Sequence, residues 1–176
     1  MPDQTAAALL ASALLLSPAG LGAQSPARRD SIVQVVRSLI EGAHYAALVT
    51  TAPDGSPQAR TVDPFAPDSA FVVWIGTNPR TRKVAEIRRD PRVTLYWFDP
   101  KALGYVTLHG RARLVNDSAE KARRFKPAWA AFYPDRARDF LLIEVRPQRL
   151  EVVSPAHGIT GDSLTWRPPT VTLPRR

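Results

Sequence analysis

Cysteine is absent from the 176 residues of this chain. Its absence excludes disulfides, cysteine-ligated zinc, iron–sulfur clusters and thiolate catalysis together. Histidine is almost as scarce, because only His44, His109 and His157 occur and no two of them are close in sequence. We therefore expect neither a histidine-rich metal site nor a histidine-based catalytic triad, and we predict no metal.

The chain also lacks an apolar run long enough to cross a bilayer as a helix, which takes about 18 residues or more. Its longest run, AAALLASALLL at 6–16, is followed by Pro18 and by small residues up to Ala23. This order is typical of a secretory signal peptide. We predict a signal peptide over 1–23 and an exported protein, periplasmic or extracellular, without stable membrane insertion. Because residues 1–5 contain no Lys or Arg, the alternative is an extension from a misplaced start codon on a cytoplasmic protein.

Acidic residues are outnumbered, with 16 Asp and Glu against 24 Lys and Arg and a sequence pI of about 10.6. A basic surface attracts nucleic acid, anionic membranes or phosphorylated ligands. Proteins that bind single-stranded nucleic acid interleave aromatic and basic side chains. Here Phe71, Trp74 and Trp97 lie in apolar runs instead, so we expect no nucleic-acid partner.

The chain contains 17 prolines, which favours short elements separated by turns. The length fits one domain, which we place at residues 30–155, before an extended proline-rich tail at 156–176. Apolar spacing, cap residues and turn residues predict three helices, at 31–43, 79–89 and 118–126. They also predict strands at 45–51, 57–65, 71–76, 93–98, 104–115, 140–146 and 149–154, the last two forming a hairpin. Mostly antiparallel strands with a few short helices indicate a mainly β protein of the α+β class, folded as a small barrel.

Two strands carry further information. Residues 71–76, FVVWIG, are apolar at every position, which predicts a strand covered on both faces. We expect a second copy of the chain to cover the face that a single barrel leaves open. In the strand at 104–115 a polar set alternates with an apolar one. The polar face, which meets solvent, a partner or a ligand, carries Tyr105, Thr107, His109, Arg111 and Arg113.

The segment GTNPRTRK at 76–83 joins the apolar strand to the next helix. Asn78 and Pro79 suit the cap and the first helical position. The first turn of a helix favours acidic residues, yet this one has Arg80, Arg82 and Lys83. Such a pattern is explained if an anion binds there, with Thr77 and Thr81 as hydroxyl donors and Arg60 approaching from the preceding strand. The alternative is a solvated basic surface.

Four segments together carry a family resemblance: ALVTTAPDGSPQARTV, GTNPRTRKVAEIRRDPRVTLYW, GYVTLHGRARLV and AFYPD. Over about residues 35–153 the chain resembles the pyridoxamine 5′-phosphate oxidase-like FMN-binding split-barrel proteins, especially their short general-stress-protein-like branch. The resemblance implies a six- to seven-stranded antiparallel split β-barrel, FMN as cofactor, and a homodimer with flavin at the subunit interface. The cofactor-binding residues that it implies are Arg60, Thr61, Val62, Gly76, Thr77, Thr81, Arg82, Lys83 and Tyr105.

The resemblance has limits that shape the expected function. The oxidases carry a C-terminal Arg and Trp that bind pyridoxal phosphate, and we find no such motif in the tail of this chain. Tyr105 also stands where the oxidases have a Gln. We therefore expect an FMN-dependent oxidoreductase that acts on an unknown small molecule, not a pyridoxamine phosphate oxidase, and we assign no catalytic residue. The alternative is a non-catalytic protein that binds flavin, deazaflavin or haem.

Tryptophan offers candidates for stacking on a flavin ring. Trp97 alternates with Val93 and Leu95, so we expect it to be a core residue. Trp129 and Trp166 lie in less regular segments and are the better stacking candidates.

Overall fold

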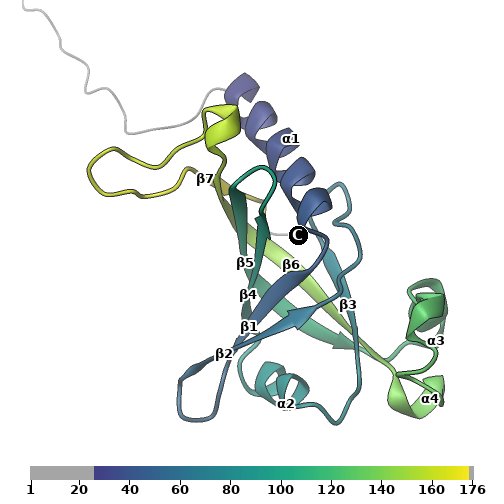
Figure 1. Ribbon diagram of the computed structural model, residues 1–176. Coiled ribbons are helices and arrows are strands. Elements are labelled where there is room, and N and C mark those ends of the chain that lie inside the picture. Colours follow the sequence, from purple (N-terminus) through teal and green to yellow (C-terminus); the bar gives the residue numbers. More distant parts are fainter. Residues whose placement is uncertain (1–25, 175–176) are drawn as a thin grey trace, which may run out of the picture.

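The computed structural model describes residues 26–174, so the predicted signal peptide and its cleavage point lie outside the described residues. The chain forms one sheet with helices packed around it (Figure 1). The strands are β1 Ala46–Thr51, β2 Pro57–Val62, β3 Val73–Thr77, β4 Arg92–Asp99, β5 Gly104–Val115, β6 Leu141–Val153 and β7 Thr170–Thr172. The α-helices are α1 Pro26–Ala43, α2 Arg82–Arg89, α3 Ser118–Arg123 and α4 Arg136–Asp139, and short 3-10 turns occupy Pro127–Trp129 and Pro155–His157. Within 26–174 no helix has the length and apolarity that a membrane span needs.

Every strand pairs antiparallel with its neighbours, in the order β2-β1-β4-β5-β6-β3, and β7 adds to β6. The two ends of this order meet, because Pro64, just after β2, bridges to Ile75 in β3. The Phe65 N–H also donates to the Trp74 carbonyl at 2.8 Å. The sheet therefore curls into a half-barrel, and the predicted antiparallel split barrel with short helices is confirmed.

The main core lies between the inner face of the sheet and α1. Val36 and Leu39 of α1 are almost fully buried against Leu95, Trp97 and the neighbouring strands. Trp97 is thus the core residue that the sequence predicted. The helix ends at Ala43 as expected but begins at Pro26, five residues earlier than its apolar spacing indicated.

A second cluster of side chains covers the outer face of β3. We call it the aromatic cluster; it comprises Val115, Trp129, Phe140 and Leu142, with Phe65, Trp74, Phe125 and Tyr133 partly buried against them. Gly76 of β3 lies directly under it, because a Cβ on Gly76 would stand 2.5 Å from the Trp129 ring and 2.7 Å from the Phe140 ring. The chain itself therefore covers much of the face of β3 for which we expected a second copy.

The predicted hairpin over 140–154 is wrong, because β6 runs unbroken from Leu141 to Val153. Pro147, which lies between the two predicted strands, is at an irregularity where the register against β5 shifts between His109 and Gly110. Gly110 makes this possible, since a Cβ there would stand 2.4 Å from the Arg146 carbonyl oxygen. Proline is tolerated in a strand at such a bulge.

The C-terminal tail returns to the sheet rather than leaving it. Val171 of β7 pairs opposite Leu150 and is buried in the main core. Between β6 and β7 the chain forms an arm, in which the side chains of Leu164 and Trp166 are exposed. Trp166 touches none of the residues that the resemblance assigns to the cofactor, and its stacking role stays a prediction.

Candidate functional site

The basic segment 77–83 forms a tight turn between β3 and α2 (Figure 1). The Asn78 side chain accepts a hydrogen bond from the Arg80 N–H at 2.9 Å, and the Asn78 carbonyl accepts one from the Thr81 N–H at 3.1 Å. Asn78 therefore stabilises a turn and does not cap a helix. The helix α2 begins at Arg82, with Thr81 as the residue before it, three residues later than predicted. Arg82 and Lys83 still occupy its first turn.

The two threonines that were predicted as donors to an anion lie side by side in this turn. Thr77 is the buried last residue of β3, and its Oγ1 lies 3.2 Å from the Oγ1 of Thr81. Thr81 Oγ1 donates to the Asn78 carbonyl at 2.9 Å, so Thr77 is the donor between the two hydroxyls. Both hydroxyl protons are used inside the turn. A bound anion would have to turn one hydroxyl away from these partners, which leaves the cations as its main contacts.

The three cations of the turn have different surroundings. Arg80 pairs with Asp139 of α4 at 2.9 Å, and this hydrogen bond lowers the pKa of the Asp139 carboxyl. Arg82 is exposed and makes one long contact of 3.4 Å with the Gln58 side chain of β2. Lys83 is half-buried and has no hydrogen bond or ion pair within the described chain. Burial, and then the charge of Arg60, lower the pKa of Lys83.

Arg60 lies beside this turn but is already neutralised. Its guanidinium pairs with Glu86 of α2 at 2.8 Å and donates to Thr50 Oγ1 and to the Leu48 carbonyl. Glu86 is buried, and burial alone would raise its pKa. The hydrogen bonds from Thr50 and Arg60 and the charge of Arg60 outweigh burial, so the pKa of Glu86 is lowered. The sequence did not single out Glu86, because its partners Thr50 and Arg60 lie in other strands.

Three further predicted residues lie on the strands next to the turn. Thr61 points outward from β2, whereas the Val62 side chain is buried in the main core. Gly76 lies behind Thr77 and beneath the aromatic cluster. Arg60, Thr77, Thr81, Arg82 and Lys83 are thus brought together around the first turn of α2, with Thr61, Val62 and Gly76 on the strands that adjoin it.

Tyr105 is not brought to this turn within one chain. It lies at the start of β5, where Gly104 packs under Leu39 of α1. The other end of β5 adjoins α2, because the Ala112 N–H donates to the carbonyl of Pro91. The Tyr105 ring contacts Tyr96, with centroids 5.5 Å apart, and burial followed by the charges of Tyr96 and Glu151 raises its pKa.

A polar network that the sequence did not reveal borders the aromatic cluster. The Asp63 carboxylate accepts hydrogen bonds from Lys126 Nζ at 2.5 Å and from Trp129 Nε1 at 3.0 Å. His44 Nε2 lies 3.4 Å from the same carboxylate. Trp129, a predicted stacking candidate, is therefore buried and hydrogen-bonded inside the fold. Residues so far apart in sequence leave no local signal. Across 26–174 no three side chains of the metal-ligating types gather into a site.

Comparison with known proteins identifies the family. The sequence profile of the family described as pyridoxamine 5′-phosphate oxidase matches residues 32–154. The chain belongs to this family. Its matched segment begins in α1 and ends just after β6, so the family domain contains the whole basic turn and the half-barrel around it. No functionally curated protein matches the chain.

Solved structures share the fold. A Clostridium acetobutylicum protein related to general stress protein 26 matches with a TM-score of 0.66 and 17% identity, over 82% of this chain and 95% of that one. A Nostoc punctiforme protein described as pyridoxamine 5′-phosphate oxidase-related and FMN-binding matches with a TM-score of 0.56 and 17% identity, over 88% and 100%.

Other members of this structural group have different ligands in their descriptions. An F420 reductase matches with a TM-score of 0.53 and 26% identity, over 65% of this chain and 94% of that one. A haem-binding protein from Mycobacterium smegmatis matches with a TM-score of 0.58 and 21% identity, over 86% and 60%. The shared fold therefore accommodates several cofactors.

Proposed function

We propose that this protein binds FMN, with the phosphate at the first turn of α2, and that it is an oxidoreductase acting on a small molecule. The observation that carries the proposal is the state of Lys83. It is a half-buried cation at the positive end of a helix and has no hydrogen bond or ion pair within the described chain, and the charge of Glu86, which is itself paired with Arg60, only partly offsets its burial. Both its burial and its position oppose a positive charge, and a bound phosphate would relieve both.

The residues around Lys83 suit a phosphate. The first turn of a helix has N–H groups without intrahelical acceptors, and these groups bind anions. Arg82 adds a second cation with only one long contact. The Arg60–Glu86 pair contributes little net charge to the site, so Arg82 and Lys83 are left to balance a phosphate that carries close to two negative charges.

When bound, FMN supplies the hydride or electron chemistry, and the chain supplies binding and orientation. The β2 segment that contains Arg60, Thr61 and Val62 adjoins the turn through the Arg82–Gln58 contact, which supports the proposal that it lines the flavin. Glu86 acts on this segment by holding Arg60 against Leu48 and Thr50. We do not propose pyridoxamine phosphate oxidase activity, because the tail lacks the substrate-binding motif.

We further propose a homodimer with flavin at the interface. Tyr105 supports it, because this residue reaches the first turn of α2 only if a second copy supplies it. The outer face of the sheet next to Tyr105 also exposes Tyr96 and Phe98, at 37% and 48% of their surface. Burial of these rings in a dimer would remove apolar surface from water. The alternative function is a non-catalytic protein that binds flavin, deazaflavin or haem on the same fold.

Purification of the full chain, followed by the absorption spectrum and the mass of the cofactor released on denaturation, tests the proposal. We expect a flavin spectrum and the mass of FMN, with bleaching and recovery of colour on reduction and exposure to air. A haem or deazaflavin spectrum would favour the alternative. Release of riboflavin alone, from a preparation offered both flavins, would contradict the phosphate site.

A further inference from the structure

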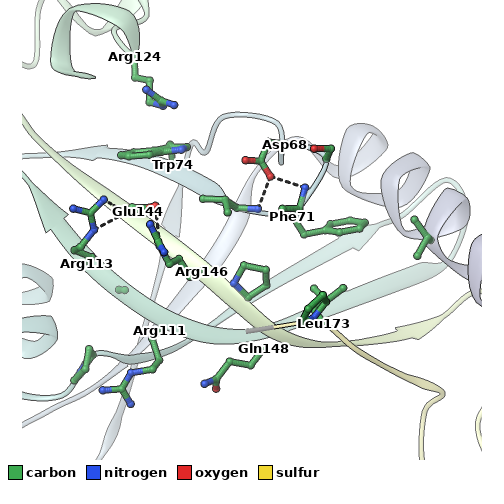
Figure 2. A pocket seen from close by; sticks show the side chains of 18 of the residues that line it. Asp68, Phe71, Trp74, Arg111, Arg113, Arg124, Glu144, Arg146, Gln148 and Leu173 are labelled. Atoms are coloured by element: carbon green, nitrogen blue, oxygen red, sulfur yellow. Dashed lines mark hydrogen bonds and ion pairs between the residues drawn. The ribbon is translucent and has the colours of Figure 1, made fainter. Parts of the chain in front are cut away.

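A cavity of about 970 Å³ lies away from the first turn of α2. Its floor is formed by the outer faces of β5, β6 and β3, and its walls by the loop before β3, the start of α1 and the end of the tail (Figure 2). None of the nine residues that the resemblance assigns to the cofactor lines it. Its volume lies in the range of small-molecule sites, about 300–1,000 Å³.

Arginine dominates the charge of this cavity, which we call the arginine groove. Five arginines and three acidic residues line it. The arginines are Arg29, Arg111, Arg113, Arg124 and Arg146, and the acids are Asp30, Asp68 and Glu144. The excess of positive charge favours an anionic occupant.

Two of the acids are already engaged. Glu144 is buried and accepts hydrogen bonds from Arg113 Nε at 2.6 Å and from Arg146 Nε at 3.1 Å. Figure 2 shows both guanidinium groups converging on this carboxylate. Asp68 accepts hydrogen bonds from the N–H groups of Ala70 and Val72. Glu144 is therefore already paired with two arginines, and the Oδ1 atom of Asp68 is used in the loop before β3.

Of the other three arginines, Arg29 donates to the Thr172 carbonyl and Arg124 pairs with Glu120, which leaves Arg111. It stands directly opposite Arg92 on β4 and Arg146 on β6, so three cations form one row across the sheet. Like charges in such positions destabilise a sheet. Arg92 pairs with Asp90 at 2.7 Å and Arg146 with Glu144, whereas Arg111 has no hydrogen bond or ion pair within residues 26–174. Its guanidinium is exposed on the groove and can grip a carboxylate through two N–H groups.

Beside Arg111 the groove is apolar. Pro91, Pro147 and Val72 line it, together with the half-buried indole of Trp74. The guanidinium of Arg124 lies 3.9 Å from the centroid of the Trp74 ring, which fixes the indole in place. A ligand that meets both parts of the groove must have an anionic end and an apolar body.

We propose that the arginine groove binds a small organic carboxylate with an apolar body. The carboxylate lies on Arg111, and the body lies along Trp74 and Pro147. Arg113 and Arg146 hold the Glu144 carboxylate between them on the same face, and this pairing shows that guanidinium groups there bind a carboxylate. The site lies apart from the first turn of α2, where the FMN phosphate is proposed to bind.

Calorimetric titration of the full chain with 2-naphthoate tests the proposal, with 2-naphthamide as the uncharged probe of the same shape. We expect naphthoate to bind and naphthamide to bind at least tenfold more weakly. Arg111→Gln removes the charge-assisted hydrogen bonds and should weaken naphthoate about tenfold or more. Arg92→Gln is the matched control, because it removes a cation of the same row that does not line the groove. It should change the affinity by less than about twofold.

Three results would overturn the proposal. Equal affinity for naphthoate and naphthamide would show that the charge of the groove has no role. Equal losses in Arg111→Gln and Arg92→Gln would show a general effect of surface charge. Absence of naphthoate binding, with a dimer that weakens in Arg111→Gln by sedimentation, would show that a second copy occupies the groove. Should Arg111→Gln fail to fold, Arg111→Lys replaces it, and unchanged affinity in that variant would contradict recognition by the guanidinium group.

Discussion

Replacement of Lys83 by Gln is the most informative perturbation of the proposed flavin site. Gln keeps most of the side-chain length and removes the charge. Lys83 has no hydrogen bond or ion pair within the described chain, so the variant breaks no internal contact of that kind. Any loss of binding then reports on the ligand.

The expected loss follows from the chemistry of one contact. A hydrogen bond to a charged group contributes about 1.5–3 kcal/mol, which corresponds to about a 10- to 150-fold weaker Kd for FMN. Riboflavin has no phosphate, so its Kd should change by less than about twofold. The variant without ligand should be slightly more stable, by about 0.3–1 kcal/mol, because a cation leaves the positive end of α2.

Flavin fluorescence titrations with FMN and riboflavin, combined with urea unfolding of the protein without ligand, give all of these quantities. Arg88→Gln is the matched control, because it removes one positive charge from the other end of the same helix. It should leave FMN binding nearly unchanged and should not stabilise the helix. Equal losses for FMN and riboflavin in Lys83→Gln would refute the reasoning, since Lys83 would then act on the ring or on the fold. An unchanged FMN affinity would indicate that the basic turn is a solvated surface and not a phosphate site.

Four further predictions concern the fold, the assembly and the leader. Glu86→Gln should lower the free energy of unfolding by about 1–3 kcal/mol at neutral pH. Because the pKa of Glu86 is held below its ordinary 4.5, the difference in stability from wild type should shrink as the pH falls below that value. A difference that does not change with pH would contradict the pairing of Glu86 with Arg60. Gly76→Ala should cost about 1–3 kcal/mol in urea unfolding through overpacking against the aromatic cluster, and a neutral result would mean that the rings move freely. Sedimentation of the flavin-bound protein should give a dimer, whereas a stable flavin-bound monomer would contradict the shared interface. Sequencing of the protein from its native host should find an N-terminus near Gln24, and a start at Met1 would contradict export.

Much of the fold follows from local sequence signals. Asp54-Gly55 between two extended runs predicted the β1–β2 hairpin, and the alternation along β5 predicted its polar outer face. These signals work because strand periodicity and turn residues act over a few positions. The predictions from sequence were wrong where the same residue type is common in two different local structures. The predicted break between 146 and 149 is a bulge at Pro147 within one strand, and Asn78, predicted to cap a helix, stabilises a turn.

The candidate site was likewise predicted only in part. The cations of the basic turn were predicted from their conflict with the helix dipole, which is a local property. Which of these cations are paired was not predicted, because each pairing depends on a residue far away in the sequence. Arg80 pairs with Asp139 and Arg60 with Glu86, whereas Lys83 has no hydrogen bond or ion pair in the described chain. Pairings between residues so far apart arise only when the sheet has closed, and no spacing in the sequence encodes them.

A crystal structure of the protein with FMN would show where on the fold the phosphate binds. We expect a phosphate oxygen within about 3 Å of Lys83 Nζ, with further contacts from Arg82 and from N–H groups of the first turn of α2. The β2 segment at Arg60–Val62 should lie along the flavin. A phosphate bound elsewhere, in the arginine groove for example, with the first turn of α2 facing only solvent, would contradict the account.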